Sequence, residues 1–315
     1  MILVTGATGN VGRELVRELL RAGRPVRALV RGKEGSVPAG VEIAVGDLDR
    51  PESLGAALRG VRGVFLLGGR ADMPGLLEEI RRAGVEHVVL LTSRSVVGGN
   101  PTNAIVAMWT ASEAAVRSSG MPWTILRPSG YMSNALRWLA QLRAGDLIRA
   151  PFADVPIALI DPQDIAALAA VVIGSDQHHG SSCELSGPEA LVPAEQVRVL
   201  GTALGRDLRF EGQTEAEARE ELSKIFPPSL VEAQLRFFAK GEFDDSRIAA
   251  TVSEITGRPA GTFAQWARRH ANRFAEGREG SSSTIAPIPS HTRATSSSAA
   301  WSPTRVTGPT TTRPR

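Results

Sequence analysis

A glycine-rich turn near the first residue constrains the fold more than any other feature of the chain. The segment TGATGNVG (residues 5–12) follows an apolar run and precedes an amphipathic stretch. In a strand–turn–helix unit of this kind, the first glycine permits a tight turn, the second lets the backbone approach a pyrophosphate, and the third lets the helix pack against the strand. The spacing is G-x-x-G-x-x-G rather than G-x-G-x-x-G, but the flanking pattern favours a dinucleotide cradle over an ordinary turn.

The first half of the chain alternates strand and helix patterns. The expected strands are Met1–Thr5, Val26–Val30, Val41–Val45, Gly63–Leu67, His87–Thr92 and Trp123–Leu126. The expected helices between them are Val11–Ala22, Pro51–Leu58, Met73–Ala83 and Ala104–Ser118. The spacing of the strands suits right-handed crossovers and is too wide for hairpins. The sequence therefore predicts an α/β fold with a doubly wound, Rossmann-like parallel sheet.

After residue 130 the pattern becomes mostly helical. Helical patterns cover residues 131–143, 162–173, 193–204, 214–224, 228–240 and 261–275, and short strand-like pieces lie at Ile157–Ile160 and Cys183–Leu185. We expect a cofactor domain (1–130), a smaller C-terminal region on the substrate side that packs on the sheet (131–276), and a disordered tail rich in serine, threonine and proline (277–315).

The positive net charge of the chain comes from the tail. The tail has five arginines and one acidic residue, whereas residues 1–276 hold 31 basic and 32 acidic side chains. A nearly neutral body has no field that attracts nucleic acid, a single cysteine excludes a disulfide framework, and no apolar run approaches the roughly 20 residues of a membrane span. We expect a cytoplasmic protein whose partners are a small-molecule acceptor and a second copy in a homodimer, without nucleic acid or membrane.

The end of the second expected strand indicates which dinucleotide is bound. NAD sites place an acidic side chain there for the ribose 2′-hydroxyl, whereas NADP sites place an arginine for the 2′-phosphate. This chain has Arg31 at that position and no acidic residue at the strand end. We therefore expect NADP(H) in preference to NAD(H); a solvated basic turn is the alternative interpretation.

Several blocks of sequence carry a resemblance to a known family. They are TGATGNVG, GDLDRPESL (Gly46–Leu54), ASEAAVRSSGMPWTILRP (Ala111–Pro128), IDPQDIA (Ile160–Ala166), ELSGPEAL (Glu184–Leu191) and TGRPAGTFAQWA (Thr256–Ala267). Together they resemble the NmrA-like branch of the atypical short-chain dehydrogenases/reductases over about residues 1–275. That group includes NAD(P)H:quinone oxidoreductases, triphenylmethane-type reductases and redox-sensing regulators without turnover.

The resemblance implies a set of cofactor contacts at matching positions. The pyrophosphate would lie on Gly6, Thr8, Gly9, Asn10, Val11 and Gly12, and the 2′-phosphate on Arg31. Asp47 and Leu48 would flank the adenine, and Leu67 and Gly68 would line the ribose. The nicotinamide would be bordered by residues at the ends of the fifth and sixth strands, namely Thr92, Ser93, Pro128, Ser129 and Gly130.

The chain departs from most short-chain dehydrogenases in its proton donor. Those enzymes use Tyr-x-x-x-Lys, in which the lysine lowers the pKa of the tyrosine so that the phenol can pass a proton to the substrate oxygen. Here the only tyrosine, Tyr131, has no lysine four residues later. Aligning Glu113 with the family's helix places Ile105 and Trp109 at the positions of the pair.

This departure favours an electron-poor acceptor. Reduction of an ordinary ketone leaves a basic alkoxide and benefits from a positioned acid, whereas a reduced quinone is a stabilised phenolate that can take its proton from water. We therefore expect an NADPH-dependent reductase that transfers hydride to a small electron-poor acceptor such as a quinone. A non-catalytic regulator that senses the redox state of NADP(H) is the alternative, because it needs the same cradle.

The segment after the sixth strand supplies the candidate acceptor site. The candidate catalytic residues are Ser93 and Tyr131, although Tyr131 could instead stack on a planar substrate or serve in packing. The residues expected to line the acceptor pocket are Tyr131, Met132, Asn134 and Trp138.

Other chemical groups fit structural roles better than functional ones. The Phe237–Phe238 pair fits a core stripe, and Asp161 and Asp164 fit the start of a helix better than a pair of catalytic carboxylates. No metal site is expected, because the cluster at His178, His179 and Cys183 lacks a fourth ligand.

Overall fold

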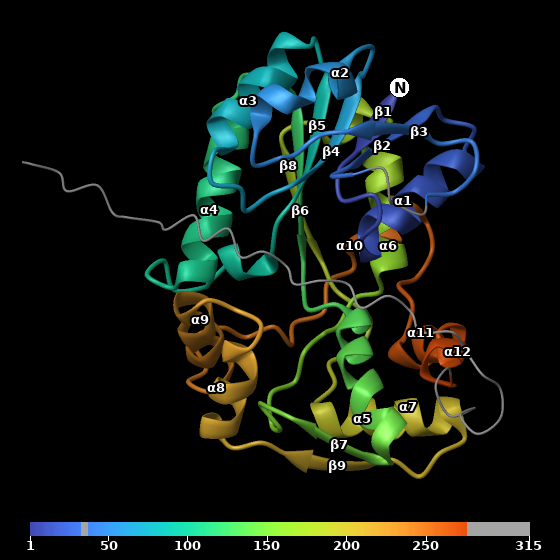
Figure 1. Ribbon diagram of the computed structural model, residues 1–315, viewed down its shortest axis with the longest axis vertical. Helices are drawn as coiled ribbons and strands as arrows, with labels where there is room; N and C mark the ends of the chain where they lie inside the picture. Colours follow the sequence, from blue (N-terminus) through green and yellow to red (C-terminus); the bar gives the residue numbers. More distant parts are fainter. Residues whose placement is uncertain (33–36, 276–315) are drawn as a thin grey trace, which may run out of the picture. The chain divides into compact units, whose positions relative to one another are not determined.

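Seven parallel strands form one sheet of the structure (Figure 1). The structure is a computed structural model that describes residues 1–32 and 37–275. The strands lie in the order β3-β2-β1-β4-β5-β6-β8, with the bounds β1 (Ile2–Val4), β2 (Val26–Val30), β3 (Glu42–Val45), β4 (Gly63–Leu67), β5 (His87–Leu91), β6 (Trp123–Pro128) and β8 (Ser181–Leu185). The expected doubly wound parallel sheet is confirmed.

The strand order reverses next to β1. The chain moves outward from β1 to β2 and β3, and then returns to β4 on the other side of β1. In open α/β sheets, a ligand crevice forms outside the carboxyl ends of the strands at such a reversal. The residues that follow β1, β2, β4, β5 and β6 are therefore placed to bind a ligand.

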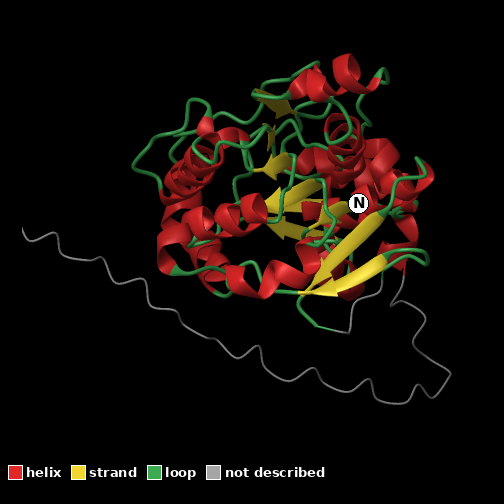
Figure 2. Ribbon diagram, turned by 90° about the horizontal axis from the view of Figure 1, so that it is seen from above, coloured by secondary structure: helices red, strands yellow, loops and turns green. Residues whose placement is uncertain are grey.

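Helices cover both faces of the sheet, and each face has its own hydrophobic core (Figures 1 and 2). One core contains α1 (Asn10–Arg21), α6 (Pro162–Val172) and α10 (Thr251–Thr256). The other contains η1 (Pro51–Leu54), a 3₁₀ helix, with α2 (Gly55–Leu58), α3 (Met73–Arg82) and α4 (Ala104–Arg117). Because successive strand residues point to opposite faces, Leu3 packs in one core and Val4 in the other.

The residues after β6 build a third core. It contains the 3₁₀ helix η3 (Met132–Trp138), α5 (Leu139–Ala144), α7 (Pro193–Leu204), α11 (Phe263–Arg269), α12 (Ala271–Ala275), and a two-stranded sheet of β7 (Leu147–Ala150) and β9 (Arg209–Gly212). A smaller core joins α8 (Glu215–Ser223) to α9 (Pro228–Phe238), and single 3₁₀ turns lie at η2 (Arg94–Val96) and η4 (Asp176–His178). The expected helical character of this region is confirmed.

Some local predictions in this region are wrong. The stretch 131–143 is a 3₁₀ helix followed by a short α-helix, and Ile157–Ile160 makes single bridges to Leu191 and Tyr131 without forming a strand. The strands β7 and β9 were not predicted. Each has four residues, which give too few alternations to distinguish a strand from a loop by periodicity.

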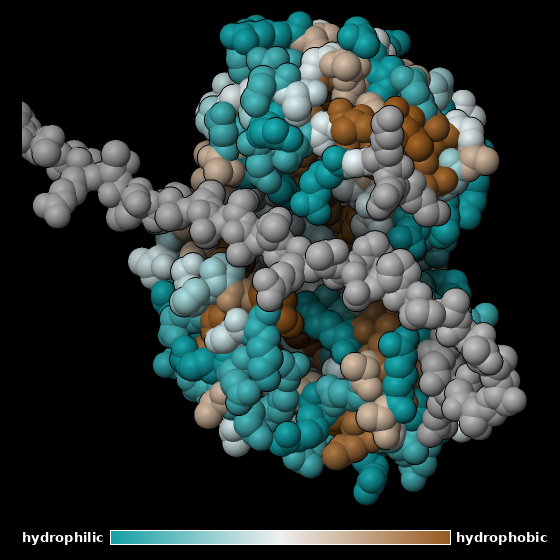
Figure 3. All heavy atoms as spheres, viewed as in Figure 1, coloured by the Kyte–Doolittle hydropathy of each residue, from teal (hydrophilic) through white to brown (hydrophobic). Residues whose placement is uncertain are grey.

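The residues after position 130 contribute to more than one layer. The helices α6 and α10 pack on the sheet, and β8 is one of its strands. The described residues lie within one compact unit, and the expected tail, 277–315, lies outside them. On the face shown in Figure 3, hydrophilic residues cover most of the described surface, and apolar side chains gather in a hollow near the middle of the view. Within the described residues, no helix has the length and apolar character of a membrane span.

A buried ion pair ties α4 to the ends of β5 and β6. Glu113 is 3% exposed and accepts two hydrogen bonds from Arg127, at 2.8 Å and 2.5 Å. It also accepts hydrogen bonds from Thr92 (3.1 Å) and Arg117 (3.3 Å). Burial alone would raise the pKa of Glu113, but the hydrogen bonds and charge of Arg127, with the other two donors, lower it.

Replacing this carboxylate tests how much the ion pair stabilises the fold. We expect Glu113→Gln to lower the free energy of unfolding at pH 7 by about 3 kcal/mol, because it leaves the partly buried Arg127 charge without its carboxylate partner. Urea denaturation followed by circular dichroism measures this. Since the pKa of Glu113 is lowered on folding, the difference from wild type is largest above the ordinary glutamate pKa of about 4.3 and shrinks as the pH falls through the folded pKa.

Glu86→Gln is the matched control. Glu86 forms a comparable pair with Arg62 at 2.7 Å, but both side chains are exposed, so the urea midpoint should stay that of wild type. Equal destabilisation by the two substitutions would contradict the special role of the buried pair.

Candidate functional site

Two glycines of the turn after β1 hold positions that no other residue could occupy without movement. Gly6 has a φ of +60°, and a Cβ there would lie 2.5 Å from Leu67 Cδ1. A Cβ on Gly12 would lie 2.2 Å from the carbonyl oxygen of Gly6. The start of α1 therefore approaches the turn and the end of β4 closely, as a pyrophosphate cradle requires.

The first turn of α1 lacks the groups that usually satisfy a helix N-terminus. Its N-cap is Gly9, which has no side chain to accept a hydrogen bond, and no acidic residue lies in the first turn. Five other helices start with a side-chain cap, from Asp72, Asn103, Asp161, Thr214 and Thr262. The free N–H groups and the positive end of the α1 dipole thus fit an anion such as a pyrophosphate.

The other residues of the turn are placed around these N–H groups. Thr8 is exposed, and its carbonyl accepts a hydrogen bond from Arg13 (3.1 Å). The side-chain amide of Asn10 donates to Ser133 Oγ (3.1 Å), which ties the cradle to η3. Val11 is buried in the core below α1.

The residues expected to bind the adenosine half lie at neighbouring strand ends. Arg31 follows β2, is exposed, and makes no side-chain hydrogen bond or ion pair with the other described residues. Asp47 follows β3, accepts a hydrogen bond from Asp49 N (3.0 Å) and pairs with Arg50 at 3.7 Å, whereas Leu48 is buried. Gly68, after β4, has no room for a Cβ, which would lie 3.2 Å from the Trp109 ring.

A cavity of about 370 Å³ lies at the ends of β5 and β6. It brings together the residues expected at the nicotinamide and two of those expected at the acceptor: Thr92, Ser93, Pro128, Ser129, Gly130, Tyr131 and Asn134. The other walls come from α4, α9 and the segments on either side of α9, and their apolar members are Ile105, Met108, Trp109, Phe226, Leu230, Phe237, Phe238 and Phe243. We call this cavity the acceptor pocket.

Two of the residues expected in this pocket lie elsewhere. Met132 and Trp138 are buried in the third core, at 0% and 9% exposure, together with Ala135. A 3₁₀ helix has three residues per turn, so positions 132, 135 and 138 share one face, and positions 131 and 134 lie on another. Because the sequence predicted an α-helix here, it did not separate these two faces. In the structure, Tyr131 and Asn134 are the two of the four that line the pocket.

The structure also corrects the interpretation of Phe237 and Phe238. Both line the acceptor pocket rather than serving only as a core stripe. The apolar side of a helix has the same sequence pattern whether it meets a core or a cavity. Ile105 and Trp109, which stand where the family's Tyr and Lys would align, also line the pocket, so that wall offers no acid.

The hydroxyl groups of the pocket differ in their availability. The Thr92 hydroxyl donates a hydrogen bond to Glu113, and the Ser129 hydroxyl donates one to the carbonyl of Ala158. Ser93 Oγ accepts from Ser95 N (3.2 Å). The Tyr131 hydroxyl makes no hydrogen bond with other described residues, and burial raises its pKa, so Tyr131 stays a neutral phenol.

Asp245 is a pocket residue that the sequence did not reveal. It is 5% exposed, and its Oδ2 accepts a hydrogen bond from Gly130 N (2.9 Å). Oδ1 lies 3.4 Å from Arg94 Nε without the geometry of a hydrogen bond. Burial raises the pKa of Asp245 to about 6, against the influence of Arg94 and Gly130. No motif surrounds Asp245, and its contacts with Arg94 and Gly130 join residues more than a hundred positions apart.

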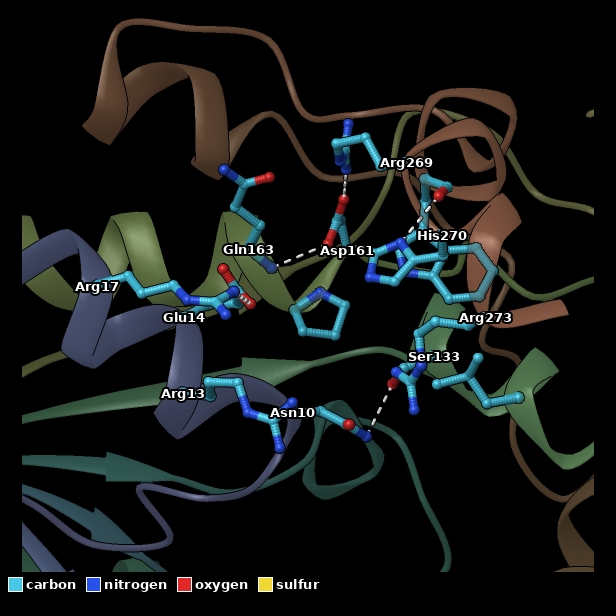
Figure 4. Close-up of a pocket in the computed structure, with 13 residues that line it drawn as sticks. Asn10, Arg13, Glu14, Arg17, Ser133, Asp161, Gln163, Arg269, His270 and Arg273 are labelled. Carbon is cyan, nitrogen blue, oxygen red and sulfur yellow. Dashed lines mark hydrogen bonds and ion pairs between the residues drawn. The ribbon is translucent and has the colours of Figure 1, made fainter. Parts of the chain in front are cut away.

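A second hollow, of about 490 Å³, lies beside the cradle (Figure 4). Its charged members are Arg13, Glu14, Arg17, Asp161, Arg269 and Arg273. Arginines outnumber carboxylates by two, although Arg17 pairs with Glu14 (2.7 Å) and Arg269 with Asp161. The hollow therefore adds positive charge next to the phosphate cradle.

The acidic pair at the start of α6 has a structural role, as expected. Asp161 caps the helix by accepting from Gln163 N (2.9 Å), as Figure 4 shows, and Asp164 accepts from Gly261 N (2.7 Å). In the described part of the chain, no three His, Cys, Asp or Glu side chains are grouped to hold a metal ion.

Known proteins with similar sequences and folds cover nearly all of the described chain. The NmrA-like family matches residues 1–261. A (4-alkanoyl-5-oxo-2,5-dihydrofuran-3-yl)methyl phosphate reductase of Streptomyces griseus is 40% identical over 87% of this chain and 99% of its own length. An NAD(P)H azoreductase of Xenophilus azovorans is 35% identical over 87% of this chain and 99% of its own.

A solved structure supports the fold. The NADPH complex of an NADPH-dependent quinone oxidoreductase from Escherichia coli superimposes with a TM-score of 0.70 at 24% identity, over 85% of this chain and 99% of that one. The named sequence relatives are oxidoreductases, the class of enzyme expected from the sequence. With its glycine cradle, strand order and matched length, the chain belongs to the NmrA-like family.

Proposed function

We propose that this protein is an NADPH-dependent reductase that transfers hydride to a small, planar, electron-poor acceptor. The observation that carries the proposal is the acceptor pocket, which opens at the strand ends where the nicotinamide is expected and has aromatic walls. Trp109, Phe237 and Phe238 offer flat apolar surfaces that suit a conjugated ring.

The residues of the cradle fit the cofactor that this function needs. The uncapped start of α1 binds the pyrophosphate through its N–H groups, and Arg31 binds the 2′-phosphate from the end of β2. Thr92, Ser129 and Gly130 border the nicotinamide, whose dihydro form supplies the hydride when the cofactor is bound. The apolar walls exclude water from the acceptor carbon.

The names of the relatives support an electron-poor acceptor. A 5-oxo-2,5-dihydrofuran ring with a 4-alkanoyl group contains a carbon–carbon double bond conjugated with two carbonyls, and an azo compound contains a nitrogen–nitrogen double bond. In each case the charge left by hydride addition is spread over neighbouring atoms. The absence of Tyr-x-x-x-Lys from the pocket suits such acceptors, because their products need less help from an acid than an alkoxide does.

A comparison of acceptors tests the reaction. With NADPH, we expect kcat/KM for quinones and doubly activated enones to exceed that for cyclohexanone by at least about 10²-fold. Reduction of a ketone to an alkoxide benefits most from the Tyr-x-x-x-Lys acid that this chain lacks, and one general acid contributes 10²- to 10⁴-fold. Loss of NADPH absorbance at 340 nm measures the rates. Equal rates for the two classes would contradict the proposal, and tight NADPH binding without turnover of any acceptor would favour the redox-sensing regulator instead.

Cofactor preference is tested by Arg31→Ala. We expect NADPH to bind about 10- to 100-fold more weakly, because a charge-assisted hydrogen bond to the 2′-phosphate is lost, whereas the Kd of NADH should stay the same. Isothermal titration calorimetry measures both. Arg62→Ala is the matched control, since Arg62 precedes β4 and therefore lies at the amino ends of the parallel strands, whereas Arg31 lies at the carboxyl ends. An unchanged NADPH affinity in Arg31→Ala would exclude Arg31 as the discriminating residue.

A further inference from the structure

Two residues that line the acceptor pocket have buried polar atoms without hydrogen-bond partners among the described residues. They are Asp245 Oδ1 and Ser95 Oγ, and both residues line the cavity. Nη2 of the neighbouring Arg94 is also without a partner. Buried polar atoms in folded proteins are nearly always paired, so unpaired atoms on a pocket wall indicate that a bound molecule supplies the partner.

The backbone holds Asp245 firmly in this position. Its carbonyl accepts a hydrogen bond from Ala158 N (2.8 Å), and its Oδ2 accepts from Gly130 N (2.9 Å), the residue that follows β6. One carboxyl oxygen is thus fixed at the strand end where the nicotinamide is expected. The other carboxyl oxygen, Oδ1, makes no hydrogen bond with the described residues and lies 3.4 Å from Arg94 Nε.

We propose that Asp245 is a catalytic residue that donates a hydrogen bond, and then a proton, to the oxygen of a conjugated carbonyl acceptor. This inference rests on the proposed reductase function and narrows its substrates to acceptors whose reducible double bond is conjugated with a carbonyl group. The acid then comes from the segment after α9 and not from α4, which carries Ile105 and Trp109.

The step balances in atoms and charge. Hydride addition to the acceptor carbon oxidises the nicotinamide by two electrons and places a negative charge on the acceptor oxygen. The O–H bond of Asp245 breaks, and its proton forms the new O–H bond of the product. The resulting carboxylate is stabilised by Gly130 N and the Arg94 charge at 3.4 Å, and it regains a proton from water before the next cycle.

The charges around Asp245 keep it available as an acid. Arg94 is the cation facing it, while Arg94 Nη1 donates to the carbonyl of Arg247 (2.6 Å). The negative charge of the adjacent Asp244 raises the pKa of Asp245, as burial does. Tyr131 also lines the pocket and stays a neutral phenol. With a pKa of about 6, about a tenth of Asp245 is protonated at pH 7, far more than for an ordinary aspartate.

A series of acceptors with graded product basicity tests this role in Asp245→Asn. A general acid matters most for the most basic product oxygen, so we expect kcat to fall about 10²-fold or more for cyclohexenone, whose enolate is conjugated with a single carbonyl, and by less than about 10-fold for a benzoquinone. The Kd of NADPH should stay at the wild-type value. Because the two rates come from one preparation, their ratio does not depend on the folded fraction.

Asp154→Asn is the matched control. It removes an exposed aspartate that does not line the pocket, and it should leave the ratio of the two rates as in wild type. An equal loss for all acceptors in Asp245→Asn would overturn the proposal and show a structural role, while the proposed reductase function would stand on the wild-type rates. Absence of turnover in wild type would overturn both.

The wild-type pH profile tests the same point if Asp245→Asn fails to fold. The acid must be protonated, so kcat/KM for cyclohexenone should fall about tenfold per unit as the pH rises above about 6, while that for the quinone stays level. Level profiles for both acceptors would overturn the role of Asp245.

Discussion

The close approach of α1 to the turn after β1 is the constraint on which the rest of the site depends. Gly12 lies against the carbonyl of Gly6, and Gly6 lies against Leu67 at the end of β4. This packing aims the uncapped start of the helix at the crevice where the strand order reverses. A side chain at Gly12 would clash with the backbone of Gly6 and Ala7 and push the helix away, and one at Gly6 would clash with Leu67. A missing N-cap would weaken most helices by about 1 kcal/mol, but here it leaves N–H groups for a phosphate.

The acceptor pocket follows from the way distant segments close over the strand ends. The ends of β5 and β6 supply one wall, and α9 with the segment after it supplies the other. Two polar contacts hold these segments together. The buried carboxylate of Glu113 on α4 accepts a hydrogen bond from Arg127 on β6, and Gly130 N after β6 donates one to Asp245 after α9. Each satisfies a group that would be costly to bury alone. The unpaired oxygen of Asp245 stands out against this background.

The pocket separates two tasks that a single Tyr-x-x-x-Lys helix combines in related enzymes. The positions on α4 that face the cavity are apolar, so this wall shapes the pocket and excludes water. The polar group comes instead from the segment after α9, where burial raises the pKa of the Asp245 carboxyl group beside Arg94. This arrangement is in keeping with the conjugated acceptors named for the relatives.

The sequence by itself determined the features that depend on local geometry. The positive φ at Gly6, the apolar runs of the central strands and the position of Arg31 after β2 follow from neighbouring residues, so the sheet and the cradle could be predicted. The tertiary structure decided which faces meet. The three-residue turn of η3 buries Met132 and Trp138 and leaves Tyr131 and Asn134 at the pocket, and folding brings Asp245 to Gly130 across 115 positions. Burial and the pKa it sets depend on such long-range contacts, which no local pattern encodes.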